Sequence, residues 1–397
     1  MADGNGRIRS IDIIRGAVMV LMALDHVRVY AGLPAGGPTP GIFFTRWITN
    51  FCAPAFIFFA GTSAYLYGKR HPGLPRFLAT RGLWLVFLEL VVIRIAWTFN
   101  LDFSHFLMAG VIWAIGWSMI LLALLVRLPV RVVGLLGLVV LAGHNLLDPR
   151  FFELVSSAQA GGAYWLWSIL YVGFWGGPVL LGGTGHDFWV LYSIVPWVGV
   201  MAAGYAFGAI VTLEPARRNR LCWQIGLSAT ALFLVLRGLD LYGDPVAWRD
   251  AVHPAEGRPP MPALLAFLNT TKYPASFLFL LMTLGPTIAL MPWLEGAHGA
   301  VARWLTVFGR VPMFFYLLHI PLIHALAVLV SLVRTPADTA WLFTNHPMAN
   351  PPAPAGYPWS LGMLYAGWLV AVVLLYHPCR WFAGLKARRT EAWLSYL

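Results

Sequence analysis

The feature that most constrains this chain is a series of long apolar runs, separated by short stretches that hold nearly all of its charged residues. A run of about 20 apolar residues is long enough for one helical crossing of a bilayer. Only 11% of the 397 residues are charged, whereas a water-soluble domain carries roughly a quarter, because its surface must be wetted. The sequence therefore predicts an integral membrane protein whose partner is the lipid bilayer.

Ten such runs predict an all-α fold, a polytopic membrane bundle of about ten transmembrane helices that forms a single domain over residues 1–397. An even number of crossings puts both termini on one side. The runs lie at residues 11–30, 51–68, 82–99, 106–126, 132–147, 188–211, 221–239, 275–294, 311–333 and 360–378.

The distribution of Lys and Arg predicts that both termini are cytoplasmic, because cytoplasmic loops keep an excess of positive residues. With the N-terminus inside, the inner segments hold 17 of the 27 Lys and Arg residues and the outer segments hold 6. An eleventh apolar run, residues 163–183, would reverse every later loop if it crossed. We therefore interpret this Gly- and Pro-broken stretch as a re-entrant or interfacial element on the outer face.

Composition also excludes several classes of site. The three cysteines lie in or beside apolar runs without the paired spacing of a metal site or disulfide framework, so no metal is expected. The net charge of +11 is dispersed over short loops, and no basic domain exists to bind nucleic acid. We expect no nucleic-acid partner, and the sequence leaves a homodimer open.

The first apolar run is the most informative segment, because it carries ionisable residues at membrane depth. Arg15 and His26 are eleven residues apart, so they lie on one face of a helix, about 16 Å apart along its axis. Met19 and Met22 lie on the stripe between them. Asp25 lies at the depth of His26 and would raise the basicity of a nearby imidazole. The alternative is that Arg15 pairs with an acidic neighbour one turn earlier and His26 faces the headgroups.

Other polar residues gather at the predicted outer ends of the helices or within them. Arg46 and Asn50 precede the second run, and Lys272 precedes the eighth. His319 lies about halfway through the ninth run, where a lone His is either a packing residue or part of a site. We predict that these four residues contact a substrate. The intramembrane charges Glu89, Arg94 and Arg237 have no partner that the sequence identifies; like the outer-end residues, they can also be structural.

Four segments carry a family resemblance: RSIDIIRGAVMVLMALDHVRVY, FFTRWITNFCAPAFIFFAGTSAYL, FLNTTKYPASFLFLLMTLGP and FGRVPMFFYLLHIPLIH. Together they resemble the bacterial branch of the heparan-α-glucosaminide N-acetyltransferase-like membrane proteins, over nearly the whole chain. The Arg15 to His26 spacing also resembles the signature of the wider type 3 membrane acyltransferases.

The resemblance implies location in the bacterial cytoplasmic membrane and use of acyl-CoA, expected to be acetyl-CoA, as co-substrate. It associates Arg15 with that donor and His26 with catalysis, and the acceptor would be a sugar hydroxyl or amine on the outer face. Residues 27–50 contain no His, unlike the lysosomal enzyme, and Asn50 stands where bacterial relatives often have His. A heparan-type acceptor is therefore not carried over.

Two functions compete. In a membrane-bound O- or N-acyltransferase, Arg15, Met19 and Met22 would bind the donor, and His26 would act as base with help from Asp25. Arg46 and Lys272 would contact the acceptor or the oxyanion. In the alternative, a transporter or flippase for a small or lipid-linked anion, the intramembrane charges would line a path. Transporters usually show repeats with corresponding broken helices, and none is evident here.

Overall fold

The computed structural model describes residues 8–34, 39–104, 106–150, 164–173, 177, 179–181, 186–254, 259–344, 353–389 and 391–396. Its elements are almost all helices, which confirms the predicted fold class. The chain divides into two compact units. The first unit holds residues 1–52, 91–106 and 293–397, and the second unit holds residues 53–90 and 107–292. One domain over residues 1–397 stays a prediction.

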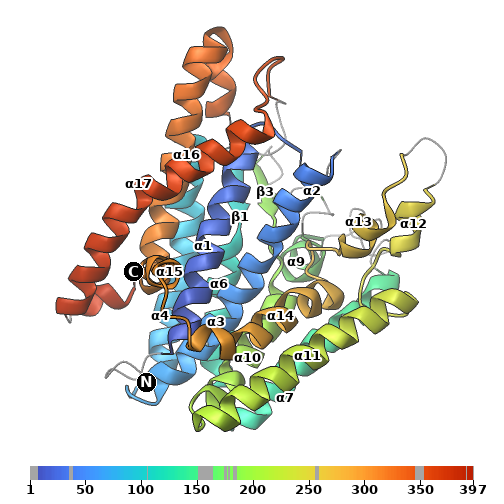
Figure 1. The fold of residues 1–397 in the computed structure, drawn as a ribbon, viewed down its shortest axis with the longest axis vertical. Coiled ribbons are helices and arrows are strands. Elements are labelled where there is room, and N and C mark those ends of the chain that lie inside the picture. The colour runs from blue at the N-terminus through green and yellow to red at the C-terminus, as the bar shows by residue number, and fades with distance from the viewer. Residues whose placement is uncertain are drawn as a thin grey trace. The chain divides into compact units, whose positions relative to one another are not determined.

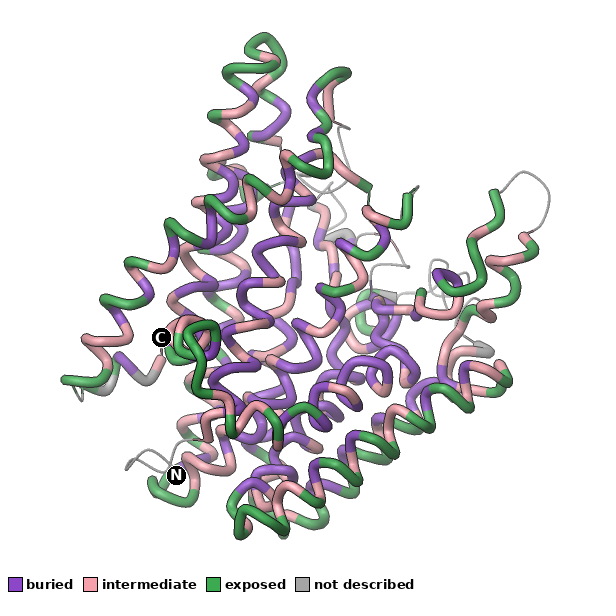
Figure 2. The backbone as a smooth tube through the Cα atoms, in the orientation of Figure 1, coloured by how far each residue is buried: buried purple, intermediate pink, exposed green. Residues whose placement is uncertain are grey.

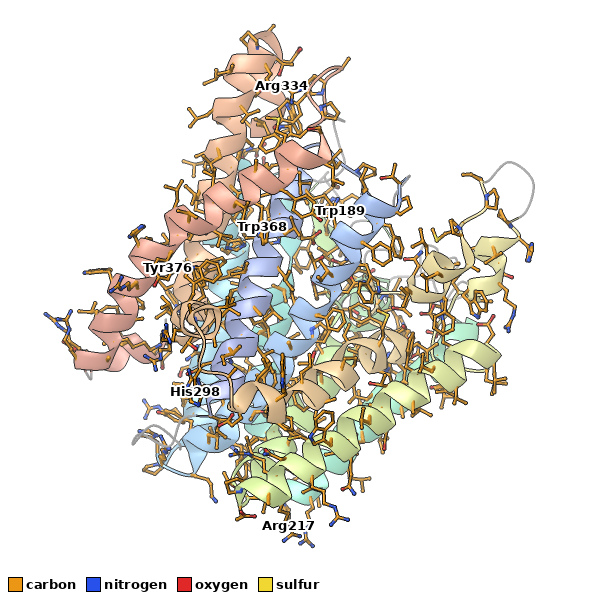
Figure 3. The ribbon with its side chains drawn as sticks, in the orientation of Figure 1. Trp189, Arg217, His298, Arg334, Trp368 and Tyr376 are labelled. Carbon is orange, nitrogen blue, oxygen red and sulfur yellow. The ribbon has the colours of Figure 1, made fainter. Side chains whose placement is uncertain are left out.

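Helix α1 (Arg9–Tyr30) is the centre of the first unit. It packs against α15 (Ala300–Arg310), α16 (Pro312–Arg334) and α17 (Leu361–Arg388), and Figure 1 shows α15 and α17 beside it. Trp368 on α17 is labelled in Figure 3, and its indole Nε1 donates to the carbonyl oxygen of Val20 at 2.8 Å. Most side chains of α1 are buried. Its polar groups can therefore be covered by protein.

Two glycines allow α1 and α15 to approach each other closely. A Cβ atom at Gly16 would lie 1.9 Å from the carbonyl oxygen of Leu305, and one at Gly309 would lie 1.8 Å from that of Asp12. Small residues let the backbones of membrane helices come this close. The two contacts are one turn apart on α1, so they fix this helix against α15.

We expect Gly16→Ala to lower the free energy of unfolding by about 1–3 kcal/mol, because the added methyl group overpacks the contact with α15. The measurement is thermal unfolding in detergent, followed by labelling of the buried cysteines with a thiol-reactive dye. Gly362→Ala on α17 is the matched control, since a Cβ there meets nothing within 4 Å. Equal melting temperatures for the two variants would contradict the close contact.

The first unit is completed by shorter helices. Thr39 caps α2, its hydroxyl accepting from the backbone nitrogen of Ile42, and Ser360 caps α17 in the same way. The shorter elements are α2 (Pro40–Trp47), η1 (Ile48–Phe51), α5 (Arg94–Thr98), η6 (Pro336–Phe343) and η7 (Ala392–Ser395).

The second unit is a helical bundle in which α10 packs against α7 and α6, and α4 packs against α6. A π-helix, η2 (Leu88–Ile93), continues α4 without a break and passes into α5. The other helices are α3 (Cys52–Gly68), α4 (Leu74–Phe87), α6 (Val111–Leu125), α7 (Val130–Gly143), η3 (His144–Arg150), α10 (Ile194–Val211), α11 (Pro215–Leu239), α12 (Trp248–Val252), α13 (Ala263–Leu268) and α14 (Phe277–Glu295).

The apolar stretch 163–183 contains no long helix within its described residues. It forms α9 (Tyr164–Trp167), the π-helix η4 (Ser168–Val172) and the strand β2 (Val179–Leu181). β2 pairs antiparallel with β3 (His186–Val190), which also pairs with β1 (Phe106–Ala109). This element fits the interpretation of a stretch that does not cross as one helix, and its place at the outer face stays a prediction. The three-stranded sheet was not predicted, because strands of three to five residues leave no clear periodicity.

Each of the ten predicted crossings contains a helix, although the run 106–126 begins with β1 and the run 188–211 begins within β3. Within the described residues, seven helices are long and apolar enough to span a membrane. The crossings of α1, of the continuous helix that begins at Leu74, and of the 15-residue α6 stay predictions, as does the cytoplasmic side of both termini. The seven are Pro40–Gly68, Val130–Asp148, Ile194–Val211, Pro215–Leu239, Phe277–Glu295, Pro312–Arg334 and Leu361–Arg388.

Several of these helices present apolar side chains outward. Figure 2 shows exposed and intermediate residues along much of α11 in the second unit and of α17 in the first. The exposed side chains include Leu227, Leu234 and Val235 on α11, and Leu369 and Val373 on α17. Exposed apolar surface of this extent is stable when lipid covers it. Both faces are therefore consistent with a bilayer.

Candidate functional site

The most distinctive polar contact in the first unit joins two histidines from different helices. Nδ1 of His26 on α1 lies 2.7 Å from Nε2 of His319 on α16. The two rings are nearly parallel, with centroids 4.8 Å apart. The two residues meet because α1 and α16 pack against each other. The sequence marked both histidines as site residues but gave no reason to pair them.

His319 has no solvent exposure and is held by its own helix. Its Nδ1 lies 2.6 Å from the carbonyl oxygen of Tyr316 and 3.2 Å from that of Phe315. The Phe315 ring stacks on it with centroids 5.4 Å apart. The ring of His319 is thus fixed in position and rotation, with Nε2 directed at His26.

His26 is half-buried, and aromatic side chains support it. The ring of Trp97, on α5, meets it edge-on with centroids 4.9 Å apart. Tyr30 stacks on Trp97 and donates from its hydroxyl to the Trp97 carbonyl oxygen at 2.8 Å. The hydroxyl of Tyr357 in turn donates to the Tyr30 carbonyl oxygen at 2.7 Å. Sequence reasoning missed these three aromatic residues, because aromatic residues are common throughout the apolar runs.

Asp25 lies in a cluster with two arginines. Its Oδ1 accepts from Nε of Arg28 at 3.0 Å and lies 3.9 Å from Nε of Arg46. Arg46 also donates from Nη1 to Oδ1 of Asn50. Both guanidinium groups therefore lie against the carboxylate of Asp25. The structure thus brings the predicted residues Asp25, Arg46 and Asn50 together, and help from Asp25 to His26 stays a prediction.

The residues predicted to bind the acyl donor, Arg15, Met19 and Met22, lie on α1 before His26. This helix is continuous from Arg9 to Tyr30, so Arg15 and His26 share one face as the spacing predicts. Arg15 is partly exposed, whereas Met19 and Met22 are buried among other side chains. The binding roles of these three residues stay predictions.

Lys272 belongs to the second unit, in the segment between α13 and α14. It is 8% exposed, and its Nζ lies over the ring of Tyr273, 5.3 Å from the centroid. A buried ammonium over an aromatic face is stabilised by a cation–π interaction. Its predicted contact with an acceptor stays a prediction.

His324 is a further buried histidine, and the sequence analysis gave it no role. Its Nδ1 lies 3.0 Å from the carbonyl oxygen of Ala96, and its Nε2 lies 2.9 Å from that of Leu342. The rings of Tyr30 and Phe99 stack on it with centroids 4.7 and 3.8 Å away. The ring therefore ties α16 to α5 and η6 beside the aromatic support of His26.

The intramembrane charges prove to have local, mostly backbone, partners. Glu89 accepts from the backbone nitrogens of Ile112 and Trp113, at the start of α6, at 2.9 and 3.2 Å. An anion at a helix N-terminus is stabilised by the unpaired N–H groups and the helix dipole. Arg94 donates to carbonyl oxygens of the loop that follows α5, including Asn100 at 2.6 Å and Phe106 at 3.2 Å.

Arg237, on α11, also bonds mainly to backbone groups. Arg237 donates to four carbonyl oxygens, those of Val246, Ala266, Phe267 and Asn269, at 3.0 to 3.1 Å. Its Nη1 also lies 3.9 Å from Oδ2 of Asp244. Glu89, Arg94 and Arg237 therefore each hold a helix end or a loop in place.

Within the described residues, no group of three or more His, Cys, Asp or Glu side chains is arranged to hold a metal ion. What the first unit does offer is an imidazole pair, together with two guanidinium groups on Asp25, the residue that precedes His26. A half-buried imidazole held in one orientation can take up and return a proton, and nearby guanidinium groups can stabilise an anion.

Comparison with known proteins identifies the family. Residues 7–242 match the family model of the catalytic region of heparan-α-glucosaminide N-acetyltransferase. The match includes Arg15, Asp25, His26, Arg46 and Asn50, while Lys272 and His319 lie beyond it. A search of curated proteins gives no match to the chain. Because the family model covers more than half of the 397 residues, the chain belongs to the heparan-α-glucosaminide N-acetyltransferase-like family of membrane proteins.

Proposed function

We propose that this protein is a membrane-bound acyltransferase that moves an acetyl group from cytoplasmic acetyl-CoA to a hydroxyl or amine of a sugar or similar acceptor on the outer face. The observation that carries this proposal is the His26–His319 pair, in which an intramembrane imidazole on the Arg15 helix is held in one orientation by a second imidazole. Family membership supports the reaction class. The bacterial cytoplasmic membrane is the proposed location.

In the proposed reaction, His26 acts as general base. It takes the proton of the acceptor hydroxyl or amine while the acceptor atom bonds to the thioester carbonyl carbon. The carbon–sulfur bond then breaks, and the imidazolium of His26 returns the proton to the departing CoA thiolate. One base and a stabilised oxyanion suffice for this chemistry. We assign the oxyanion and acceptor contacts to Arg46 and Asn50, which lie in the same unit as His26.

The donor site is proposed at Arg15. A guanidinium on α1 would bind a phosphate of CoA, because its fork of donors matches phosphate oxygens. The acyl arm would then extend along Met19 and Met22 toward His26. Both methionines are buried, so they face protein rather than lipid.

The transporter alternative is weakened by the partners of the buried charges. A path for an anion needs cations that are available to the solute, whereas Arg94 and Arg237 are engaged by several carbonyl oxygens each. Glu89 is engaged by the start of α6. These residues are therefore better explained as structural.

The first test is calorimetric titration of acetyl-CoA into the protein in detergent, for the unaltered chain and for Arg15→Ala. We expect saturable binding that Arg15→Ala weakens at least tenfold, since a charge-assisted contact to phosphate contributes about 1.5–3 kcal/mol. Arg303→Ala is the control, because Arg303 is an exposed arginine on α15, at the same predicted inner face. Equal loss in both variants would leave only a general charge effect, and no binding to folded protein would reject the donor site.

Uptake assays separate the two functions further. A protein reconstituted in vesicles that moves an anionic sugar without acetyl-CoA would support the transporter. Release of CoA thiol that depends on an added acceptor would support acyl transfer.

A further inference from the structure

The ring nitrogens that carry hydrogen in the His26–His319 contact can be deduced from the other hydrogen-bond partner of His319. A carbonyl oxygen only accepts hydrogen bonds, so Nδ1 of His319, at 2.6 Å from the Tyr316 oxygen, carries a hydrogen. A neutral imidazole has one N–H group. Nε2 of His319 therefore holds a lone pair, and the hydrogen in its 2.7 Å contact comes from Nδ1 of His26.

The neutral form of His319 follows from its surroundings. Its ring has no solvent exposure and packs against Phe315 and Tyr316. A second ring hydrogen would put a charge in this apolar site, where an unpaired charge is costly.

This order has a consequence for His26. Since Nδ1 of neutral His26 carries its single hydrogen, its Nε2 holds the lone pair and is the basic nitrogen. When Nε2 takes up a proton, the ring becomes an imidazolium and its Nδ1–H becomes a stronger donor to His319. The contact is therefore stronger in the charged form than in the neutral one.

We propose that His319 is a positioning residue that fixes the Nδ1–H tautomer of His26, presents Nε2 of His26 as the base and stabilises the imidazolium formed during transfer. This inference rests on the proposed function of His26. His319 acts in the manner of the group that orients the base of a catalytic triad, but as a neutral acceptor. A neutral acceptor suits the site because a buried carboxylate would itself need a partner.

Two substitutions of His319 distinguish its role as a hydrogen-bond acceptor from the packing of its ring. In His319→Gln, the side-chain oxygen reaches about as far as Nε2 of histidine and can accept from His26. In His319→Phe, the ring keeps its packing and loses the acceptor. The control is His377→Gln, at an exposed histidine on α17 that has no part in the candidate site.

We expect His319→Phe to lower kcat about 10- to 100-fold with little change in the KM for acetyl-CoA, as when the outer partner of a functional imidazole is removed. His319→Gln should recover most of that loss, and His377→Gln should not lower kcat. The assay is acceptor-dependent release of CoA thiol from acetyl-CoA, with glucosamine and a methyl glucoside as amine and hydroxyl probes. Thermal unfolding of each variant corrects for folded fraction.

A second measurement does not depend on activity. Nitrogen-15 spectra of histidine-labelled protein in lipid separate protonated from unprotonated ring nitrogens, and loss of a signal in each variant assigns it. We expect Nδ1 protonated and Nε2 unprotonated in both His26 and His319. The opposite tautomer in either ring would overturn the proposal, as would a folded His319→Phe protein with unchanged kcat. Absence of transfer by the unaltered protein would instead reject the proposed function, and the spectra would still decide the hydrogen order.

Discussion

Replacing His26 with glutamine is expected to lower kcat for acetyl transfer by about 10²- to 10⁴-fold, the usual contribution of a positioned general base. Glutamine keeps a polar side chain of similar length, but it cannot take up the acceptor proton. The loss should fall on kcat rather than on acetyl-CoA binding, because the predicted donor contact at Arg15 lies about three helical turns away.

The assay for this variant is the initial rate of CoA thiol release in the presence of the sugar probes. His377→Gln is the matched control, since His377 is an exposed histidine on α17. It should retain the rate of the unaltered protein. A folded His26→Gln protein with the full rate would remove His26 from the chemistry, although the family assignment would stand.

Replacing Arg237 with methionine is expected to lower the free energy of unfolding by about 3–5 kcal/mol, the cost of removing one partner from a buried ion pair. The arginine is 1% exposed and holds four carbonyl oxygens of the segment between α11 and α14. Without it, Asp244 is left as a buried carboxylate without its cation. The four carbonyl oxygens also lose a donor.

The readout is the melting temperature from dye labelling of the buried cysteines, among which Cys222 lies on the same helix, α11. Arg249→Ala gives the comparison. Arg249 pairs with Asp240 at 3.6 Å, but its side chain is 52% exposed, and an exposed pair contributes only about 0–1 kcal/mol. Equal decreases in melting temperature would show that the contacts of Arg237 contribute no more to stability than the exposed pair of Arg249.

Much of the fold could be predicted because the length of an apolar run is set by bilayer thickness. A helix forms most of each run, even though the fourth run begins with β1 and the helix of the third run begins at Leu74 rather than at residue 82. Its first turns carry Arg76 and Arg81, which hid its start from a search for apolar residues. The sheet of β1, β2 and β3 was missed because its strands are too short to show alternation.

The candidate site could be predicted residue by residue but not as an arrangement. His26 and His319 are 293 positions apart, and no local pattern encodes their pairing. The contact between Asp25 and Arg28 is one helical turn long and was visible in the sequence, whereas that with Arg46 depends on how α2 folds back. The partners of Glu89 and Arg237 were invisible because most are backbone groups, which every residue carries.

The glycine contacts of α1 bear on how donors are distinguished. Gly16 and Gly309 bring α1 and α15 too close to slide or rotate past each other without a clash of backbone atoms. α1 is then held rigidly against α15, which fixes the separation of Arg15 and His26 at about 16 Å along the axis. Under the proposed function, this fixed separation would select acyl donors by the distance from phosphate to thioester, and a donor with a shorter arm would bind at Arg15 without reaching His26.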